Sequence, residues 1–263
     1  MKSSKICLFG AGNVAINIAK ALNLAGYRII QVYSRTLESA AQLTNRLDAS
    51  PITDPSHFDH SADVVIFALN DNALSEVISK IDFSGQLALH TSGSTSIDVF
   101  KDKAEHYGVL YPLQTFSKNR AVKFHEIPLF IEANSSKNLS NLKMLASSLA
   151  ANVFVADSIQ RKQLHLSAVF ANNFVNHLYT LASEMIKTSG FTFEVLKPII
   201  LETALKAIDS NNPGTVQTGP AIRLNKEIIE KHIEMLTLRP DLQNLYTFTT
   251  NSIVKTHHNS NII

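Results

Sequence analysis

The strongest constraint on the fold is a glycine pair that lies between an apolar run and a helical pattern near the N-terminus. The apolar run covers residues 5–9, and Gly10, Gly12 and Ala15 follow it in a Gly-x-Gly-x-x-Ala arrangement. Residues 16–25 then carry apolar side chains at helical spacing, and a second apolar run spans 29–33. A strand, a tight turn, a helix and a strand in this order form the fingerprint of a dinucleotide site. The alternative is an ordinary strand-to-helix turn that happens to need two glycines.

Each small residue has a steric role in the dinucleotide interpretation. Gly10 permits the sharp turn, Gly12 lets a pyrophosphate approach the backbone, and Ala15 lets the helix pack close to the strand. The N-terminus of the helix adds N–H groups and a partial positive charge. The turn therefore predicts cofactor contacts from Gly10, Ala11, Gly12, Asn13 and Val14.

The end of the second apolar run favours NADP over NAD. NAD-preferring sites place an acidic residue there to bind the ribose 2′-hydroxyl. This chain has Ser34, Arg35 and Thr36 at that point, and its first acid is Glu38. A permanently charged guanidinium suits a 2′-phosphate, since its donors match the phosphate oxygens. The alternative is that Arg35 is a solvated loop residue.

Composition and charge exclude several classes of protein. The 263 residues are 45% hydrophobic, which is enough for one large or two medium domains. The formal net charge is +2, from 24 basic and 22 acidic residues without a basic run, so we expect no nucleic-acid partner. No apolar run is long enough for a membrane span, and no signal peptide is evident, so we expect a cytoplasmic protein without membrane contact. Cys7 is the single cysteine, and no Cys/His spacing predicts a metal site.

Strands and helices are predicted to alternate along residues 1–156. The run 63–69 is continuously apolar after its first residue, which is typical of a strand covered on both faces of a parallel sheet. Further strands are expected at 87–90, 108–111, 128–132 and 152–155, and helices at 38–47, from about 71 to 81, at 97–106 and between the last two strands. This alternation predicts a doubly wound, mostly parallel sheet of the Rossmann type.

In such sheets ligands bind beyond the carboxyl ends of the strands. Leu69 and Asn70 end one strand and are predicted to contact the cofactor. His90, Ser92, Tyr111 and Gln114 follow two further strands, and we expect them to line the substrate side of the same cleft. The alternative for His90 is a hydrogen bond to the backbone of its own loop.

From residue 157 onward the pattern is helical. Helices are expected at 158–188, 192–208, 227–236 and 241–256. The sequence therefore predicts two domains, an NADP-binding domain over residues 1–156 and an all-helical domain for substrate binding and dimerisation over 157–263. The first helix is apolar over much of its circumference, which indicates burial in a core or an interface.

A narrow polar stripe runs along that first helix. At about 100° per residue, Arg161, His165, Asn172, Asn176 and Tyr179 fall on one side of it. Because unpaired buried polar groups are costly, the stripe favours a helix face that lines a wet cleft. His165 would donate a proton near neutral pH and Asn172 would orient a carbonyl or an amide, with Arg161 and Asn176 lining the substrate side. The alternative is that the stripe makes ordinary hydrogen bonds to the first domain or lies in a dimer contact.

Residues 218–223 read Thr-Gly-Pro-Ala-Ile-Arg, and they are predicted to form a turn that leads into a helix starting at Pro220. The exposed N–H groups at such a start, with Thr218 and Arg223 nearby, could hold an anion. A simple loop is the alternative.

Five ordered motifs together resemble a known family. They are the glycine turn at 9–15, His-Thr-Ser-Gly-Ser at 90–94, Tyr-Pro-Leu-Gln-Thr-Phe at 111–116, His165 with 171–174, and the segment 218–223. The chain resembles bacterial Rossmann-like proteins with a C-terminal domain of unknown function, which are described as NADP oxidoreductases of the deazaflavin-dependent type. The resemblance covers nearly the whole chain.

More distantly, the chain is similar to 6-phosphogluconate and 3-hydroxyisobutyrate dehydrogenases, ketopantoate reductase and pyrroline-5-carboxylate reductase. The resemblance implies an NADP(H) domain, a helical 6-phosphogluconate-dehydrogenase-like domain and a homodimer formed through it. It also implies catalytic roles for Asn172 and Asn173, although Asn173 lies off the polar stripe. The first two dehydrogenases carry a catalytic lysine shortly before this asparagine, and here Ala168 and Val169 stand in that region. The segment 218–223 continues with Leu224-Asn225, where the family usually has Gly-Asp.

Three hypotheses about function follow. In the first, the chain transfers hydride between NADP(H) and a small carbonyl, imine or deazaflavin substrate, and His165 supplies the proton. In the second, the missing lysine marks a non-catalytic NADP(H)-binding sensor or partner protein. In the third, the cleft binds no nucleotide, and Arg35→Glu then changes nothing.

Overall fold

The structure is a computed structural model that describes residues 4–117, 120 and 122–258. The chain divides into two compact units, Met1–Leu178 and Tyr179–Ile263. The last strand ends at Val155, next to the border predicted at Ala156, but the first unit continues along the following helix to Leu178. The two units are described separately below.

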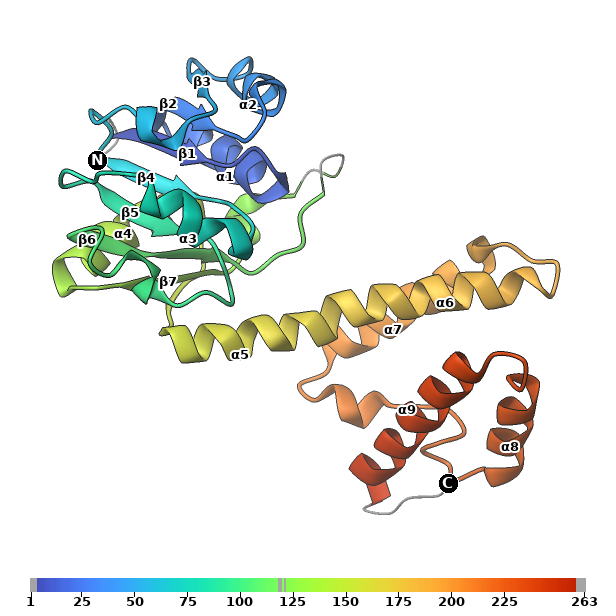
Figure 1. Cartoon of the computed structure of the whole chain (residues 1–263). Helices are drawn as coiled ribbons and strands as arrows, with labels where there is room; N and C mark the ends of the chain where they lie inside the picture. Colours follow the sequence, from blue (N-terminus) through green and yellow to red (C-terminus); the bar gives the residue numbers. More distant parts are fainter. Residues whose placement is uncertain (1–3, 118–119, 121, 259–263) are drawn as a thin grey trace. The chain divides into compact units, whose positions relative to one another are not determined.

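The first unit is built on one sheet (Figure 1). Among the described residues its strand order is β3-β2-β1-β4-β5-β6-β7-β8, and all neighbouring strands are parallel except the antiparallel pair β6 and β7. The doubly wound, mostly parallel sheet predicted from the sequence is therefore confirmed. The strands are β1 Lys5–Phe9, β2 Arg28–Tyr33, β3 Ser50–Ile52, β4 Val64–Phe67, β5 Leu87–His90, β6 His106–Pro112, β7 Leu129–Ala133 and β8 Val153–Val155.

Helices connect these strands at most of the predicted places. The α-helices are α1 Asn13–Leu24, α2 Leu37–Thr44, α3 Asp71–Ser79 and α4 Ser136–Leu149, with short 3₁₀ turns η1 Pro55–His57, η2 Ile97–Phe100 and η3 Phe124–Glu126. The helix predicted over 97–106 is wrong, because only η2 forms there. Asp102 takes the left-handed conformation with φ of +63°, which a helix cannot continue through, and His106 already belongs to β6.

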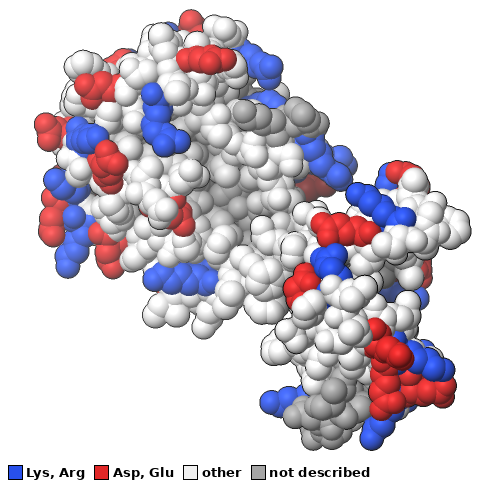
Figure 2. All heavy atoms as spheres, turned by 45° about the vertical axis from the view of Figure 1, so that its right-hand side comes forward, with Lys and Arg blue, Asp and Glu red and all other residues white. Residues whose placement is uncertain are grey.

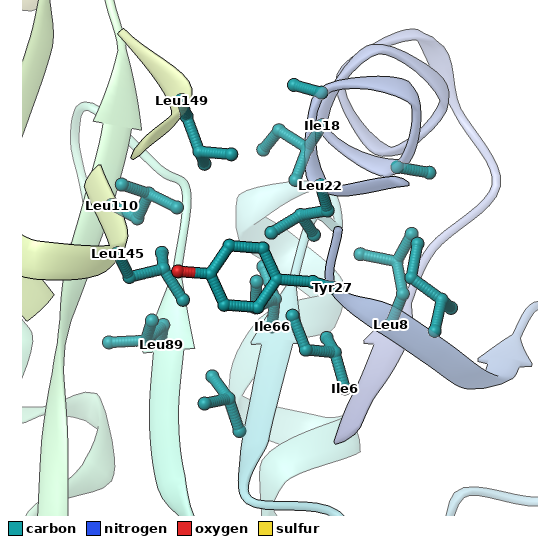
Figure 3. Close-up of a cluster of buried hydrophobic side chains, with 14 of the residues drawn as sticks. Ile6, Leu8, Ile18, Leu22, Tyr27, Ile66, Leu89, Leu110, Leu145 and Leu149 are labelled. Atoms are coloured by element: carbon teal, nitrogen blue, oxygen red, sulfur yellow. The ribbon is translucent and has the colours of Figure 1, made fainter. Parts of the chain in front are cut away.

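Two hydrophobic layers cover the faces of the sheet. On one face Tyr27 lies among side chains from the strands and from α1 and α4, including Ile66, Leu22 and Leu145 (Figure 3). On the other face aromatic rings dominate, and the ring of Phe67 lies 4.8 Å from that of Phe9 and 5.6 Å from that of Phe100. Burial on both faces explains why β1 and β4 read as continuous apolar runs.

One uninterrupted helical stretch follows β8. It consists of α5 Ser158–Ala168, a π-helical turn η4 Val169–Phe174, and α6 Val175–Lys187. Asp157 begins it with a capping box, in which its side chain accepts hydrogen bonds from the backbone while Gln160 reaches back. The helix predicted over 158–188 is therefore present, but the π-helical turn was not predicted.

All the regular secondary structure described in the second unit, up to residue 258, is helical. Besides most of α6 it contains η5 Phe193–Leu196, α7 Lys197–Asp209, η6 Pro213–Val216, α8 Lys226–Met235 and α9 Pro240–His258. His232 on α8 bonds to the hydroxyl of Tyr246 on α9 over 2.9 Å, and Arg239 lies 3.7 Å from Glu184 on α6. In the part of the chain that the structure describes, no helix has the length and apolar character needed to cross a membrane.

The segment 218–223 does not start a helix as predicted. It forms a turn closed by the bonds from Leu224 N to Ala221 O and from Asn225 N to Pro220 O. The next helix, α8, begins only at Lys226, and Asn225 caps it by accepting a hydrogen bond from Ile228 N. The helix start that was the basis for a possible anion site at 218–223 is therefore absent.

Candidate active site

The glycine turn, residues 10–12, connects β1 to α1 at the carboxyl end of β1, where the strand order reverses between β1 and β4. Gly10 has φ of +124°, and a Cβ atom there would lie 2.2 Å from the carbonyl oxygen of Ala68. This position therefore requires glycine. A Cβ atom on Gly12 would meet no protein atom within 4 Å. The absence of a side chain at Gly12 thus leaves space that no described residue fills.

The N-terminus of α1 fits a bound pyrophosphate. Its N-cap is Gly12, no side chain caps it, and no acid lies in its first turn. The first N–H groups of a helix have no partner within the helix, so they are available to an anion. Asn13 Nδ2 donates to Phe116 O over 2.9 Å, while its buried Oδ1 has no donor among the described residues. A ligand N–H or O–H would satisfy that oxygen.

The three residues after β2 differ in their availability to a 2′-phosphate. The guanidinium of Arg35 is exposed, with no hydrogen bond or ion pair to any described residue. Ser34 N donates to Ile52 O, which leaves its hydroxyl available. The Thr36 hydroxyl already caps α2 by accepting from Ser39 N and lies 2.8 Å from Ser39 Oγ. Arg35 and Ser34 therefore suit a phosphate better than Thr36 does.

A hollow of about 1050 Å³ in the first unit brings most of the predicted residues together. Its walls come from the glycine turn, the ends of β4, β5 and β6, and the helix after β8. The predicted residues that line it are Gly12, Asn13, Val14, Leu69, Asn70, Ser92, Tyr111, Gln114, His165, Asn172 and Asn173. Gly10, Ala11, Ser34, Arg35, Thr36, His90, Arg161 and Asn176 do not line it.

Arg161 is a buried anchor and not a substrate-lining residue. Its side chain is 1% exposed and forms an ion pair with Glu132 of β7. The guanidinium also donates to the backbone carbonyls of Ser92 and Thr95 and to Ser158 Oγ. Within the polar stripe predicted on this helix, Arg161 therefore binds α5 to the loop 91–95 and does not face a substrate.

His90 is also placed differently from the prediction. Its ring is fully buried, it stacks on Phe100 at 5.8 Å, and its Nδ1 accepts a hydrogen bond from Ser92 N over 3.2 Å. Burial, with the nearby Arg161 guanidinium as a second cause, lowers the pKa of His90 from 6.5 to about 3. A neutral His90 therefore supports the loop 91–95 from below, which is the alternative that the sequence left open.

His165 and Tyr111 form a pair at the wall of the hollow. The Tyr111 hydroxyl lies 3.1 Å from His165 Nδ1, and the ring centroids are 6.2 Å apart in an edge-on arrangement. Gly93 packs against both, because a Cβ atom there would lie 2.8 Å from His165 Nδ1 and from Tyr111 Cζ. The two side chains can meet because residue 93 has no side chain. His165 thus brings a titratable imidazole to the wall of this hollow.

The π-helical turn presents two consecutive amide side chains at the site. Asn172 and Asn173 both line the large hollow and a second one of about 860 Å³, which also includes Gln114 and Asn176. On a regular α-helix Asn173 would lie about 100° from Asn172. A π-helical turn has more residues per turn, is rare, and occurs frequently at functional sites. It provides a local reason why both asparagines line the hollow.

Several site residues were missed by the sequence analysis. Gly93 was considered only as part of the motif 90–94, and its contact with His165 and Tyr111 was not predicted. The bond from Asn13 to Phe116, which joins the glycine turn to the motif 111–116, was not predicted either. Asp71 at the start of α3 lines the hollow and accepts a hydrogen bond from Ser94. The polar run 70–72 after β4 was the available signal for Asp71. Over the described residues, no group of three or more His, Cys, Asp or Glu side chains could hold a metal ion.

Comparison with known families matches two parts of the chain. Residues 5–92 match the family described as NADP oxidoreductase, coenzyme F420-dependent, and residues 127–253 match a domain of unknown function, DUF2520. Among proteins of curated function, none matches the chain.

A solved structure decides the family. The chain is 46% identical to a protein from Bacteroides fragilis described as a "putative NADP oxidoreductase", with a TM-score of 0.90 over 97% of this chain and 99% of that one. The chain belongs to this NADP oxidoreductase family. The family combines the NADP oxidoreductase domain with a C-terminal DUF2520 region, as the resemblance of the five motifs implied.

More distant structures share the fold. A reductive aminase from Aspergillus terreus in complex with NADPH is 14% identical, with a TM-score of 0.70 over 99% of this chain and 97% of that one. A 1-pyrroline-5-carboxylate reductase from Streptococcus pyogenes is 13% identical, with a TM-score of 0.66 over 97% of this chain and 100% of that one. This NADP oxidoreductase thus shares its fold with a reductive aminase and with a 1-pyrroline-5-carboxylate reductase.

Proposed function

We propose that this family member catalyses hydride transfer between NADP(H) and a small carbonyl, imine or deazaflavin substrate. The observation that carries the proposal is the large hollow, in which the glycine turn and the His165–Tyr111 pair line the same space. One part of this wall is suited to a cofactor phosphate and the other to proton transfer. A reductase needs both around one substrate.

The residues that would hold the cofactor fit its groups. The uncapped N-terminus of α1 and the space above Gly12 suit the pyrophosphate, while Arg35 and Ser34 suit the 2′-phosphate. Leu69 and Asn70, with Asn13, line the hollow beyond the glycine turn. When bound, the nicotinamide supplies or accepts the hydride.

The remaining residues would orient the substrate and move the proton. Reduction of a C=O or C=N bond requires a proton on the heteroatom as hydride adds to carbon, and in this proposal the His165 imidazolium donates it and becomes a neutral imidazole. The amides of Asn172 and Asn173 can hydrogen-bond the same heteroatom or its neighbours. Ser92, Tyr111 and Gln114 complete the substrate side.

The proton-donor role is tested with His165→Gln. A general acid contributes about 10²- to 10⁴-fold in rate, so turnover of NADPH with a screened carbonyl or imine substrate should fall by about that factor. NADPH affinity, followed by nicotinamide fluorescence, should stay unchanged because His165 is not in the cofactor half of the site. Equal turnover in the variant would remove His165 from the mechanism.

The cofactor position is tested with Gly12→Ala. The added methyl meets no protein atom within 4 Å, and φ of −81° at Gly12 is accessible to alanine. The variant should therefore fold and melt like the wild type. Loss of NADPH binding in such an intact protein would support a pyrophosphate at Gly12, and unchanged affinity would contradict it.

One observation favours a second function. Ala168 and Val169 line the hollow in the region where related dehydrogenases carry their lysine, so no ammonium stands there. The chain could then be a non-catalytic NADP(H)-binding sensor or partner protein. The two functions separate in one assay, because a sensor binds NADPH but oxidises it with no carbonyl, imine or deazaflavin compound.

We also propose that the chain forms a homodimer through its helical part in the cytoplasm. Large apolar side chains on the helix after β8 and on α7 are exposed in the single chain, among them Leu166, Phe170, Phe174, Ile199, Leu201 and Ile208. Within the first unit the rings of Phe170 and Phe174 lie 4.9 Å apart, and adjoining exposed apolar side chains of this kind mark interaction sites. Sedimentation of the purified protein at several concentrations tests the proposal, and a monomer throughout would contradict it.

A further inference from the structure

The phenol of Tyr111 is held in a fixed position beside His165. Tyr111 lies on β6 and pairs with Phe130 of the antiparallel strand β7, so its backbone is fixed by the sheet. Its residue is 8% exposed, and its ring lies 6.4 Å from that of Phe130 on the neighbouring strand. The phenol is therefore held in place by the sheet and not by a mobile loop.

The contact with Gly93 shows how closely the pair is packed. Its missing side chain would overlap both the imidazole and the phenol ring at 2.8 Å. The loop that contains Gly93 is tied to α5 through the Arg161 bonds to Ser92 and Thr95. The relative position of the strand, the loop and the helix is thus defined at the point where the two rings meet.

The direction of the hydrogen bond follows from the proton that His165 gives up. An imidazolium that donates from Nε2 becomes a neutral imidazole with its remaining proton on Nδ1. The Tyr111 oxygen, 3.1 Å from Nδ1, is the acceptor that this N–H requires. Burial raises the pKa of Tyr111 above its ordinary value, against a smaller opposite effect of the Arg161 guanidinium, so the phenol stays protonated while its oxygen accepts.

We propose that Tyr111 is a positioning residue whose oxygen accepts a hydrogen bond from Nδ1–H of His165 and so leaves Nε2 as the nitrogen that donates the imidazolium proton to the substrate. After the transfer His165 is a neutral imidazole with its proton on Nδ1. The proposal rests on the proton-donor role of His165 given above. Tyr111 acts here through His165, and the bond from Nδ1–H to its oxygen is the whole of its contribution. The π-helical turn that follows α5 then provides the two amides that receive the substrate on the same wall.

The tautomer is measured directly in the full chain labelled with ¹⁵N-histidine. Two-bond ¹H–¹⁵N correlation spectra distinguish a protonated from an unprotonated ring nitrogen, and the His165 signals are those that disappear in His165→Gln. At a pH where His165 is neutral, we expect a protonated Nδ1 and an unprotonated Nε2 in the wild type, and a shift of both resonances toward the values of a free imidazole in Tyr111→Phe. An unprotonated Nδ1 in the neutral wild-type ring, or identical His165 signals in both proteins, would overturn the proposal even if no substrate is found.

Kinetics supply the second arm once a substrate is available. Loss of one net hydrogen bond corresponds to about a tenfold change, so kcat should fall by about that factor in Tyr111→Phe while NADPH affinity is unchanged. In the His165→Gln background the same substitution should have no further effect. Additive losses would mean that the hydroxyl of Tyr111 contacts the substrate itself and would refute the positioning role.

Tyr107→Phe is the matched control. Tyr107 lies on the same strand, does not line the hollow, and packs against Phe100 at 6.1 Å between ring centroids. Its variant should leave both kcat and the His165 spectrum unchanged. A failure of the proposed reductase activity would show in the wild type, whereas a failure of the positioning role shows only in the comparison of variants.

Discussion

Replacement of Arg161 by methionine should destabilise the first unit more than any exposed substitution on the same helix. The guanidinium is buried and has four partners, namely the Glu132 carboxylate, the carbonyls of Ser92 and Thr95, and Ser158 Oγ. Methionine fills much of the same volume but donates no hydrogen bond. The Glu132 side chain, which is 16% exposed, then remains without its counter-ion.

The size of the effect follows from the groups left behind. Removal of one partner of a buried ion pair costs about 3–5 kcal/mol, because the other charge stays uncompensated. The two orphaned carbonyls add to the same loss, since a buried polar group without a partner costs about 1–3 kcal/mol. We therefore expect the free energy of unfolding to fall by at least about 3 kcal/mol, within the range reported for such pairs.

Urea unfolding followed by circular dichroism measures this change from the midpoint and slope of the first unit's transition. Lys162→Met is the control, because Lys162 is the exposed neighbour on α5 and should change stability by no more than about 0.5 kcal/mol. Glu132→Gln in the Arg161→Met background should recover part of the loss. The reasoning is refuted if Arg161→Met is no less stable than Lys162→Met.

Three further predictions concern other parts of the chain. His90 is neutral in the folded protein with a pKa of about 3, so below its unfolded value of 6.5 the unfolded chain binds a proton that the folded chain does not. Stability is then lost at about 1.4 kcal/mol per pH unit as the pH falls from 6.5, and His90→Asn should remove that slope in urea unfolding. Gly10→Ala should abolish NADPH binding and lower the melting temperature, because its methyl overlaps the Ala68 carbonyl. Phe170→Asp should shift a dimer toward monomer in sedimentation without changing the melting temperature of the first unit.

Each of these predictions has a clear contrary result. An unchanged pH slope in His90→Asn would mean that the ring is not the buried neutral group described here, and the exposed His125→Asn serves as its control. A normal melting temperature for Gly10→Ala would contradict the close approach of the glycine turn to β4. An unaltered mass for Phe170→Asp would place the dimer contact elsewhere.

The sheet and the glycine turn could be predicted because their signals are local. Continuous apolar runs such as 64–67 report burial on both faces, and the glycine spacing reports a turn whose geometry no other residue permits at Gly10. The choice of His165 from the helical stripe used the same kind of evidence. A periodic pattern identified the face on which it lies, and the structure places that residue at the hollow.

The roles of His90 and Arg161 could not be predicted in this way. The position at a strand end or on a helical stripe predicts the direction of a side chain but not which segment packs over it. The side chains of His90 and Arg161 are both buried and both bond to the loop 91–95. Ser92, Thr95 and Glu132, which bind Arg161, lie 69, 66 and 29 residues from it in the sequence, so no local pattern reveals them. For His90 the bond to Ser92 is local, but the burial that lowers its pKa is not visible in the sequence. His90 and Arg161, which the sequence suggested as substrate-lining residues, instead stabilise the loop 91–95.

The π-helical turn and the break at 97–106 escaped the sequence analysis for a different reason. Helical periodicity assumes a constant angle per residue, and η4 departs from it at Asn172 and Asn173. At 97–106 the composition is compatible with a helix, but Asp102 adopts a left-handed conformation that propensity does not indicate.

The most direct test of the account is a titration of the purified protein with NADPH and with NADH, followed by nicotinamide fluorescence, in the wild type and in Arg35→Ala. We predict saturable binding of NADPH that is tighter than that of NADH, and loss of this preference in Arg35→Ala, because we propose that the exposed guanidinium binds the 2′-phosphate. Failure of both nucleotides to bind the wild type would contradict the assignment of the glycine turn and, with it, the proposed hydride transfer.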